Sequence, residues 1–404
     1  MKKTIICFIV VIIFIGTLFV IFDKKDNKKI KKEEVKTQEA VYNKYVITLD
    51  NAKLYSKGEK FFEEIGSIKK DEVLILENIK VGNYFKIEGL DYYINYNYIK
   101  KYEEEYSVND DYLNYIPFNE KIITSETKLY NDQNELVYNI KDSLEFVPLI
   151  KDDNKKYVVF NNELLHILDT DIKETIKTNI ELEEKAKEIT VFTYHFFYDG
   201  TEENKCDQII CLSQSKFEEQ LTYLKNNNYY TLTMKEFEYF LDKKINLPKK
   251  SVLITVDDGW MGTKTVLPRM LEKYDMKASL FLITGSFYYK NYQFKNLELH
   301  SHSNAMHTVG ACNMGLQGGG ILCLPENKVL EDLQITRDLL NTRAFAYPFY
   351  DYNDRAKRLL KEAGFTMAFV GKNRKAYPGI DKYEIPRYAI LSYMTMDDFI
   401  RKLG

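Results

Sequence analysis

The fold is decided by the stretch Ser251-Val252-Leu253-Ile254-Thr255-Val256-Asp257-Asp258-Gly259-Trp260. Its apolar, β-branched first part predicts a strand buried on both faces of a parallel sheet. Adjacent carboxylates such as Asp257 and Asp258 repel each other unless a cation or a shared proton relieves the repulsion. The stretch therefore indicates a metal site at the end of a buried strand. The alternative is an ordinary Asp-Asp-Gly turn at the edge of a sheet.

Strand-like and helix-like segments alternate on both sides of this stretch. Further apolar strands are expected at 189–197 and 278–284. Helical periodicity marks 215–227, 263–275 and 353–365. This alternation predicts an α/β domain with a parallel sheet, in which the catalytic groups lie at the C-terminal ends of the strands.

A second segment, Leu299–His307, holds three of the five histidines in the chain. Ions such as Zn²⁺ accept imidazole and carboxylate ligands together, and two histidines with one aspartate leave coordination positions for water and substrate. The alternative, a solvated histidine cluster, is less attractive because histidine is otherwise nearly absent. A third segment, Arg343–Asn353, predicts a strand that runs into a Pro-containing turn before a helix.

In this order, ITVDDGW, SHSNAMH and FAYPFYDYN resemble the motifs of the polysaccharide deacetylase family, the NodB-homology or carbohydrate esterase family 4 domain. The resemblance implies a distorted (β/α) barrel over residues 187–404 and an enzyme that removes acetyl groups from N-acetylglucosamine units of a polysaccharide. It also implies that Asp257 is the general base. By the same resemblance Asp258, His302 and His307 bind a divalent metal, with Zn²⁺ preferred.

The chain departs from the usual family pattern because no histidine follows Tyr383 to act as the general acid. A permuted branch of the family, typified by poly-N-acetylglucosamine deacetylases, takes this acid from a Tyr-His pair on the first strand. Tyr194-His195 is similar to that pair, so the resemblance implies that His195 is the acid. The alternative is that His195 is a core histidine on a buried strand.

The third motif departs from the family at Tyr350, where glycine is common. The arginine that braces the base in the family is matched only loosely by Arg343, and Arg387 in EIPRYAI is its rival. The implied mechanism has a metal that polarises the acetamide carbonyl and activates a water. Asp257 then takes the proton of the water, and His195 protonates the departing amine.

The N-terminus predicts a membrane anchor. Residues 4–22 are uncharged and mostly apolar, and about 20 such residues cross a bilayer as a helix. A positive start at Lys2-Lys3 without a small-residue cleavage site favours an uncleaved signal anchor over residues 1–23. A polar tether, rich in lysine and glutamate, follows over residues 24–44.

The lysines after this anchor favour the cytoplasm for the rest of the chain if the positive-inside rule is taken alone. We nevertheless expect a single-pass protein of the cell membrane whose domains lie outside the cytoplasm. Long C-terminal domains translocate despite flanking charge, and the implied chemistry belongs outside the cell.

Two small all-β units precede the catalytic domain. Short alternating segments over 45–103 resemble the bacterial SH3-like modules of cell-surface proteins, and a fainter copy follows over 118–172. The resemblance implies binding to the cell wall, with an inert spacer as the alternative. His166, in the apolar segment LLHIL, is expected to be a core histidine. The stretch 172–189 is compatible with a helix.

The net charge bears on the partners of the protein, and the spacing of the cysteines bears on disulfides or a metal site. A net charge of −3 gives no basic excess, so nucleic acid is not expected as a partner. Cys206/Cys211 and Cys312/Cys323 form two closely spaced pairs. They are compatible with disulfides in an oxidising compartment, with a Zn(Cys)4 site or with isolated thiols.

The identity of the polysaccharide is open at this stage. The predicted anchor, tether and SH3-like modules favour peptidoglycan, whereas the permuted motifs favour an exported β-1,6-linked N-acetylglucosamine polymer. We rank peptidoglycan first. The alternative of another class is a catalytically inactive protein that binds the wall, but the chain keeps Asp257, Asp258, His195 and both predicted histidine ligands.

Overall fold

In a computed structural model of the chain, the described residues are 43–404 except 51, 105, 107–111, 113, 179–183 and 201–207. The predicted anchor over residues 1–23 and almost all of the predicted tether lie outside them. Within the described part of the chain, no helix has the length and apolar character needed to span a bilayer.

The first part of the described chain is all β, as expected. Its strands are β1 (Tyr45–Thr48), β2 (Ala52–Lys57), β3 (Phe62–Ile68), β4 (Val73–Val81), β5 (Tyr84–Ile87), β6 (Tyr92–Asn95) and β7 (Ile99–Lys101). Each pairs with its neighbours in antiparallel fashion. Along β5 half-buried and buried residues alternate, which is the period expected for strands with one face in a core.

A second set of antiparallel strands follows. It consists of β8 (Glu120–Thr124), β9 (Thr127–Tyr130), β10 (Leu136–Ile140), β11 (Glu145–Phe146), β12 (Ile150–Asp152), β13 (Lys155–Phe160), β14 (Glu163–Leu168) and β15 (Ile172–Lys177). Strand β10 pairs with β3, so that strands from both predicted modules share one sheet. Their identification as SH3-like modules stays a prediction.

The expectation of a helix is wrong for residues 172–177. This segment is strand β15, which pairs with β8. Only Ile172 and Ile176 are apolar in it, too few for the buried stripe of an amphipathic helix, whereas pairing satisfies the backbone groups of β8 along its open edge.

The second part of the described chain is an α/β unit built on a parallel sheet. Its strands are β16 (Thr190–Tyr194), β19 (Tyr230–Thr231), β20 (Ser251–Asp258), β21 (Ala278–Leu282), β22 (Leu297–Ser301), β23 (Ala344–Ala346), β24 (Met367–Val370), β25 (Ile385–Pro386) and β26 (Tyr388–Ala389). Their order is β25-β24-β23-β22-β21-β20-β16-β26, with β19 beside β20. Every residue of β20 is buried, as predicted for a strand covered on both faces.

The sheet is nearly closed into a barrel. Its outermost strands, β25 and β26, are separated in sequence by Arg387 alone. Because β25 pairs with β24 and β26 pairs with β16, the chain passes from one edge of the sheet to the other at this residue. The barrel-like sheet agrees with the predicted fold class.

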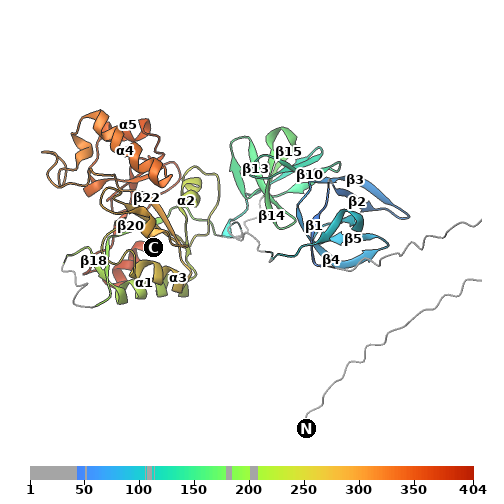
Figure 1. The fold of residues 1–404 in the computed structure, drawn as a ribbon, viewed down its shortest axis with the longest axis horizontal. Coiled ribbons are helices and arrows are strands. Elements are labelled where there is room, and N and C mark those ends of the chain that lie inside the picture. Colours follow the sequence, from blue (N-terminus) through green and yellow to red (C-terminus); the bar gives the residue numbers. More distant parts are fainter. Residues whose placement is uncertain are drawn as a thin grey trace, which may run out of the picture. The chain divides into compact units, whose positions relative to one another are not determined.

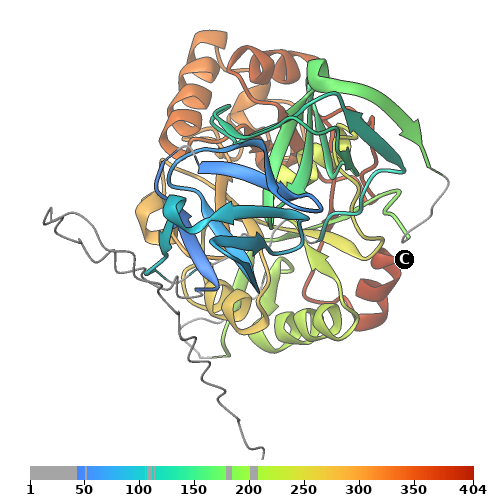
Figure 2. The same cartoon turned by 90° about the vertical axis from the view of Figure 1, so that its right-hand side faces the viewer.

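Helices surround these strands (Figures 1 and 2). They are α1 (Gln214–Asn226), α2 (Met234–Leu241), α3 (Val266–Tyr274), α4 (Glu326–Leu340), α5 (Asp354–Glu362) and α6 (Met396–Leu403). The side chains of Ser213, Thr233, Asn353 and Thr395 accept backbone N–H groups at the starts of α1, α2, α5 and α6. The helices predicted at 215–227, 263–275 and 353–365 correspond to α1, α3 and α5. A short pair, β17 (Phe196–Tyr198) and β18 (Cys211–Ser213), lies between β16 and α1.

Candidate active site

Asp257 and Asp258 are the last two residues of β20. Asp258 has φ 75° and Gly259 has φ 95°, so the chain turns sharply after the strand. A Cβ at Gly259 would lie 2.3 Å from Leu282 Cδ1, which explains why glycine occupies this position. The turn leaves Asp257 and Asp258 at the C-terminal end of β20, where sequence reasoning expected them.

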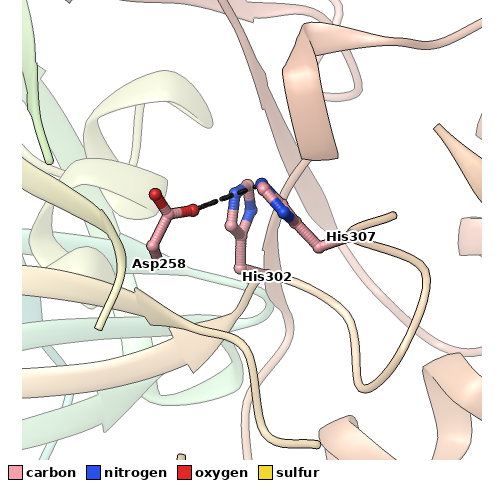
Figure 3. Close-up of side chains that lie close together, drawn as sticks. All are labelled: Asp258, His302 and His307. Carbon is pink, nitrogen blue, oxygen red and sulfur yellow. Dashed lines mark ion pairs between the residues drawn. The ribbon is translucent and has the colours of Figure 1, made fainter. Parts of the chain in front are cut away.

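Asp258, His302 and His307 come together in one cluster. Asp258 Oδ1 lies 3.3 Å from His302 Nε2 and 3.3 Å from His307 Nε2 (Figure 3). One ligand atom from each residue lies within 4.8 Å of the others. These are the three residues predicted to bind metal, and their arrangement makes a possible site for a divalent cation.

The donor atoms of this cluster suit a cation. Asp258 Oδ1 is buried and has no hydrogen-bond partner among the described residues. His302 Nδ1 lies 2.8 Å from the carbonyl oxygen of Ala346, so that Nδ1–H donates to it and Nε2 faces Asp258. Burial lowers the pKa of His302, but the carboxylates of Asp257 and Asp258 outweigh this effect and raise it, so that the site favours positive charge, a proton or a cation, between Nε2 and Asp258.

The protonation states of Asp258 and His307 suit metal binding. Burial alone would raise the pKa of Asp258, but the neighbouring His302 lowers it to about 2. Burial, aided by the charge of His302, lowers the pKa of His307 to about 4. At neutral pH Asp258 is therefore ionised and His307 is neutral, the states in which each binds a metal.

A buried aspartate that sequence reasoning missed holds the turn between the two histidines. Asp332 on α4 accepts the backbone N–H groups of Asn304 and Ala305 at 2.8 and 2.6 Å. It lies three positions after Val329 on the buried side of α4, so an acidic residue on an apolar helix face was the available signal. The contact fixes the loop that joins His302 to His307.

Asp257 points to a different partner. Arg387 Nη1 and Nη2 donate to Asp257 Oδ1 and Oδ2, each at 2.8 Å, and Arg387 is fully buried. Burial opposes the charged form of Asp257, yet Arg387 lowers its pKa below the usual range. Arg343 is exposed. Of the two arginines that sequence reasoning left open, Arg387 is the one that contacts Asp257.

His195 follows β16, and β16 lies directly beside β20. The two strands are parallel, with Tyr194 opposite Val256, so His195 and Asp257 leave neighbouring strands at the same edge. His195 Nδ1 is buried without a hydrogen-bond partner among the described residues. Burial lowers the pKa of His195, and the charges of Asp257 and Asp258 act in the opposite direction. The first strand of the α/β unit and β20 are therefore direct neighbours in the sheet.

The third motif covers the cluster with an unusual turn. Phe349 has φ 58° and Tyr350 has φ 60°, two left-handed residues in succession that are not glycine. The ring of Phe349 lies 4.2 Å, centroid to centroid, from the ring of His307. The hydroxyl of Tyr350 is buried without a hydrogen-bond partner in the described residues. The strained turn therefore places an aromatic ring against a predicted metal ligand.

Asp351, the next residue, anchors the loop that follows His307. Its carboxylate accepts the backbone N–H groups of Leu316, Gln317 and Gly319. A disulfide between Cys312 and Cys323 closes the same loop. Cys211 is also disulfide-bonded, whereas Cys206 lies outside the described residues. Of the three alternatives left open for Cys312 and Cys323, the structure has the disulfide.

The two remaining histidines lie outside the cluster. His300 Nδ1 pairs with Thr342 Oγ1 at 2.7 Å. His166 is fully buried between the rings of Tyr130 and Tyr157, as expected of a core histidine.

The sequence resembles known proteins of one kind. Residues 244–368 match the family model described as polysaccharide deacetylase. The chain is 28% identical over 227 residues to a poly-beta-1,6-N-acetyl-D-glucosamine N-deacetylase of Staphylococcus aureus strain MRSA252, covering 51% of this chain and 75% of the relative. It is 27% identical over 223 residues to the putative polysaccharide deacetylase YxkH of Bacillus subtilis strain 168, covering 54% and 76%. Among solved structures, the deacetylase PplD of Streptococcus pyogenes is 20% identical with a TM-score of 0.46, covering 54% of this chain and 98% of that one.

Proposed function

We propose, from the premise that this chain is an enzyme of the polysaccharide deacetylase family, that its substrate is a β-1,6-linked polymer of N-acetylglucosamine. The reaction class, N-deacetylation of a polysaccharide, follows from the family. The linkage is our proposal. It reverses the order expected from the sequence, in which peptidoglycan came first.

One observation carries the choice of polymer. His195 leaves β16 beside the strand that bears Asp257, which is the arrangement implied for the permuted branch of the family. The staphylococcal relative, which is named as a deacetylase of poly-β-1,6-N-acetyl-D-glucosamine, supports the same choice. For peptidoglycan the support is limited to the predicted anchor and wall-binding modules.

Within this proposal each residue of the site has one task. Asp258, His302 and His307 would hold a divalent cation, for which Zn²⁺ fits the two imidazoles and one carboxylate. When bound, such a cation polarises the acetamide carbonyl and lowers the pKa of a water molecule. Asp257 takes the proton of the attacking water, and Arg387 keeps its carboxylate oriented and ionised.

His195 delivers a proton to the nitrogen that leaves. Because burial lowers its pKa, His195 is neutral at rest and must first take up a proton. Protonation of the amine lets the C–N bond break, so that acetate and a free glucosamine unit result. The neighbouring carboxylates of Asp257 and Asp258 stabilise the transient imidazolium.

The cellular location of the enzyme is also part of this proposal. A signal anchor over residues 4–22 would hold the enzyme at the cell membrane with its domains outside the cytoplasm. The β units over 45–103 and 118–172 would bind the cell wall near the polymer. A reporter fused after Gly404 that is active only in the cytoplasm would contradict this orientation.

Acetate release tests the substrate. The purified full chain, loaded with Zn²⁺, is incubated in parallel with poly-β-1,6-N-acetylglucosamine and with purified peptidoglycan, and acetate is measured over time. We expect faster release from the β-1,6-linked polymer, and no release from either substrate with the Asp257→Asn variant. Faster release from peptidoglycan would overturn the linkage. No release from either substrate would favour the inactive wall-binding protein.

A further inference from the structure

Three aromatic residues, Phe196, Trp260 and Phe287, follow the C-terminal ends of three adjacent strands. They come after β16, β20 and β21, which are neighbours in the sheet. The ring centroids lie 6.4 Å apart between Phe196 and Trp260 and 5.8 Å apart between Trp260 and Phe287. We call these residues the aromatic strip. Since the strands are parallel, the strip lies at the same edge of the sheet as Asp257 and Asp258.

The strip is open to solvent at its centre. Trp260 is 58% exposed, although tryptophan is among the side chains that gain most from burial. Phe196 and Phe287 are half-buried on either side of it. Single exposed apolar residues are common on protein surfaces, but contacting rings beside a catalytic centre point to a binding surface.

The backbone that carries Trp260 is held rigidly. Its carbonyl oxygen accepts hydrogen bonds from the N–H and the hydroxyl of Thr263. The N–H of Phe197 donates to the carbonyl oxygen of Met261 at 3.0 Å. At Gly262, with φ 76°, a Cβ would lie 2.2 Å from the carbonyl oxygen of Phe197. The turn after β20 is therefore locked against β17.

The other side of the turn is supported in the same way. The hydroxyl of the buried Tyr292 donates to the carbonyl oxygen of Gly259 at 2.6 Å, and the Tyr292 ring lies 6.3 Å from the ring of Phe287. A turn with its backbone fixed in this way loses little conformational entropy when a ligand covers the indole that it carries. Exposure on a rigid support is the arrangement expected of a preorganised binding surface.

The chemistry of the strip suits a sugar ring. The faces of a β-linked N-acetylglucosamine unit carry axial C–H groups, because its hydroxyl and acetamide groups are equatorial, so a pyranose stacks its apolar face on an aromatic ring. Trp260 lies two residues after Asp258, and Phe196 directly follows His195, with 6.3 Å between the ring centroids of His195 and Phe196. A sugar on the strip would therefore neighbour the unit that reacts.

We propose that the aromatic strip is a polymer subsite that binds a pyranose unit next to the one that is deacetylated, with Trp260 as its central stacking surface. This inference rests on the proposed function and extends it from the reacting sugar to its neighbour. It implies that the enzyme binds oligomers more tightly than the N-acetylglucosamine monomer.

The chain contains one tryptophan, so its tryptophan emission comes from Trp260 alone. The full chain, loaded with Zn²⁺ in detergent solution, is mixed in a stopped-flow instrument with a β-1,6-linked N-acetylglucosamine hexamer, which separates binding from the slower turnover. We expect a saturable change in emission with the hexamer and a much weaker response to the monomer. Phosphatidylglycerol vesicles are mixed with the chain in a separate experiment, to test the alternative that the aromatic strip binds a lipid surface.

Affinities measured by calorimetry for variants complete the test. Trp260→Ala is expected to bind the hexamer about tenfold more weakly, and Trp260→Tyr to recover most of the loss because a ring is kept. Tyr377→Ala is the matched control: Tyr377 is 45% exposed and follows Ala376, whose backbone pairs with Ile189 before the N-terminal end of β16.

The possible results separate this inference from the proposed function. Unchanged emission with the hexamer, or unchanged affinity in Trp260→Ala, would overturn the subsite, and so would a response to vesicles alone. Binding that depends on Trp260 without any release of acetate would contradict the proposed reaction and leave the subsite standing. Acetate release with the same kcat/KM in Trp260→Ala and in the parent chain would overturn the subsite and leave the proposed reaction standing.

Discussion

Arg387 holds Asp257 through two parallel hydrogen bonds of 2.8 Å, at the point where the chain passes between the two edges of the parallel sheet. Arg387 therefore lies where the barrel-like sheet nearly closes, and it contacts the predicted general base. A planar guanidinium matches a carboxylate in this two-point geometry, which an ammonium group cannot reproduce. The pair of Arg387 and Asp257 therefore belongs both to the region where the sheet closes and to the predicted catalytic site.

Replacing Arg387 with lysine keeps the positive charge and removes the two-point contact. We expect Arg387→Lys to lower kcat about 10²-fold, since a catalytic group displaced by about 1 Å costs that much. Acetate release with the Zn²⁺-loaded variant measures the effect. Arg343→Lys, at an exposed position, is the control and should keep the kcat of the parent enzyme. Equal losses in both variants would contradict the role of Arg387.

His195→Ala tests the proposed acid. We expect turnover to fall roughly 10²–10⁴-fold while metal binding is kept, because His195 lies outside the ligand cluster. The double variant with Asp257→Asn should lose less than the product of the two single losses, since both residues serve one reaction sequence. Near-normal turnover together with a lower melting temperature would instead identify His195 as a core histidine.

Asp332 is expected to control metal affinity without contacting the metal. Asp332→Ala removes the acceptor of two backbone N–H groups in the loop between His302 and His307, so the two imidazoles lose their fixed spacing. Loss of such a supporting contact typically weakens metal binding about 10–100-fold. Titration with Zn²⁺ against a competing chelator measures the change. Asp338→Ala, at an exposed position on the same helix, should leave the affinity unchanged.

His166 makes stability depend on pH. Its two ring nitrogens are buried without hydrogen-bond partners in the described structure, and burial, followed by the charge of Lys155, lowers its pKa against the opposing effect of Asp132. In the unfolded chain a histidine titrates near about pH 6.5, so the unfolded state binds more protons as the pH falls below that value. Stability is therefore lost on acidification, until the pH falls below the lowered pKa of the folded state.

His166→Phe removes this proton uptake. We expect the melting temperature of the variant to exceed that of the parent chain at pH 5.5 by more than it does at pH 7.5. Thermal unfolding followed by circular dichroism at both pH values gives the comparison. An equal difference at the two pH values would show that titration of His166 does not contribute.

Much of the site was predictable because its chemistry lies in short segments at strand ends. Asp257 and Asp258 end a fully buried strand, and His302 and His307 follow β22 closely, so local sequence placed them at one edge of the sheet. Strand-helix alternation likewise indicated the parallel sheet. The local signals were sufficient where strand and loop belong to one continuous segment.

Contacts between distant segments were not predictable from such signals. The choice between Arg343 and Arg387 depended on how the sheet closes, which no local pattern reports. Asp332 and Asp351 act through backbone N–H groups of loops that lie elsewhere in the sequence. The strand at 172–177 depends on its pairing with β8, and a tertiary partner overrides weak helical propensity.

If the chain removes acetyl groups from a polysaccharide through a cation held by Asp258, His302 and His307, its activity must depend on that cation. The most direct measurement is acetate release from poly-β-1,6-N-acetylglucosamine by the chelator-treated full chain as Zn²⁺ is added, with His302→Ala measured in parallel. We expect no release without metal, recovery that saturates near one Zn²⁺ per chain, and little recovery in His302→Ala. Undiminished release after chelation, or full recovery in His302→Ala, would contradict it.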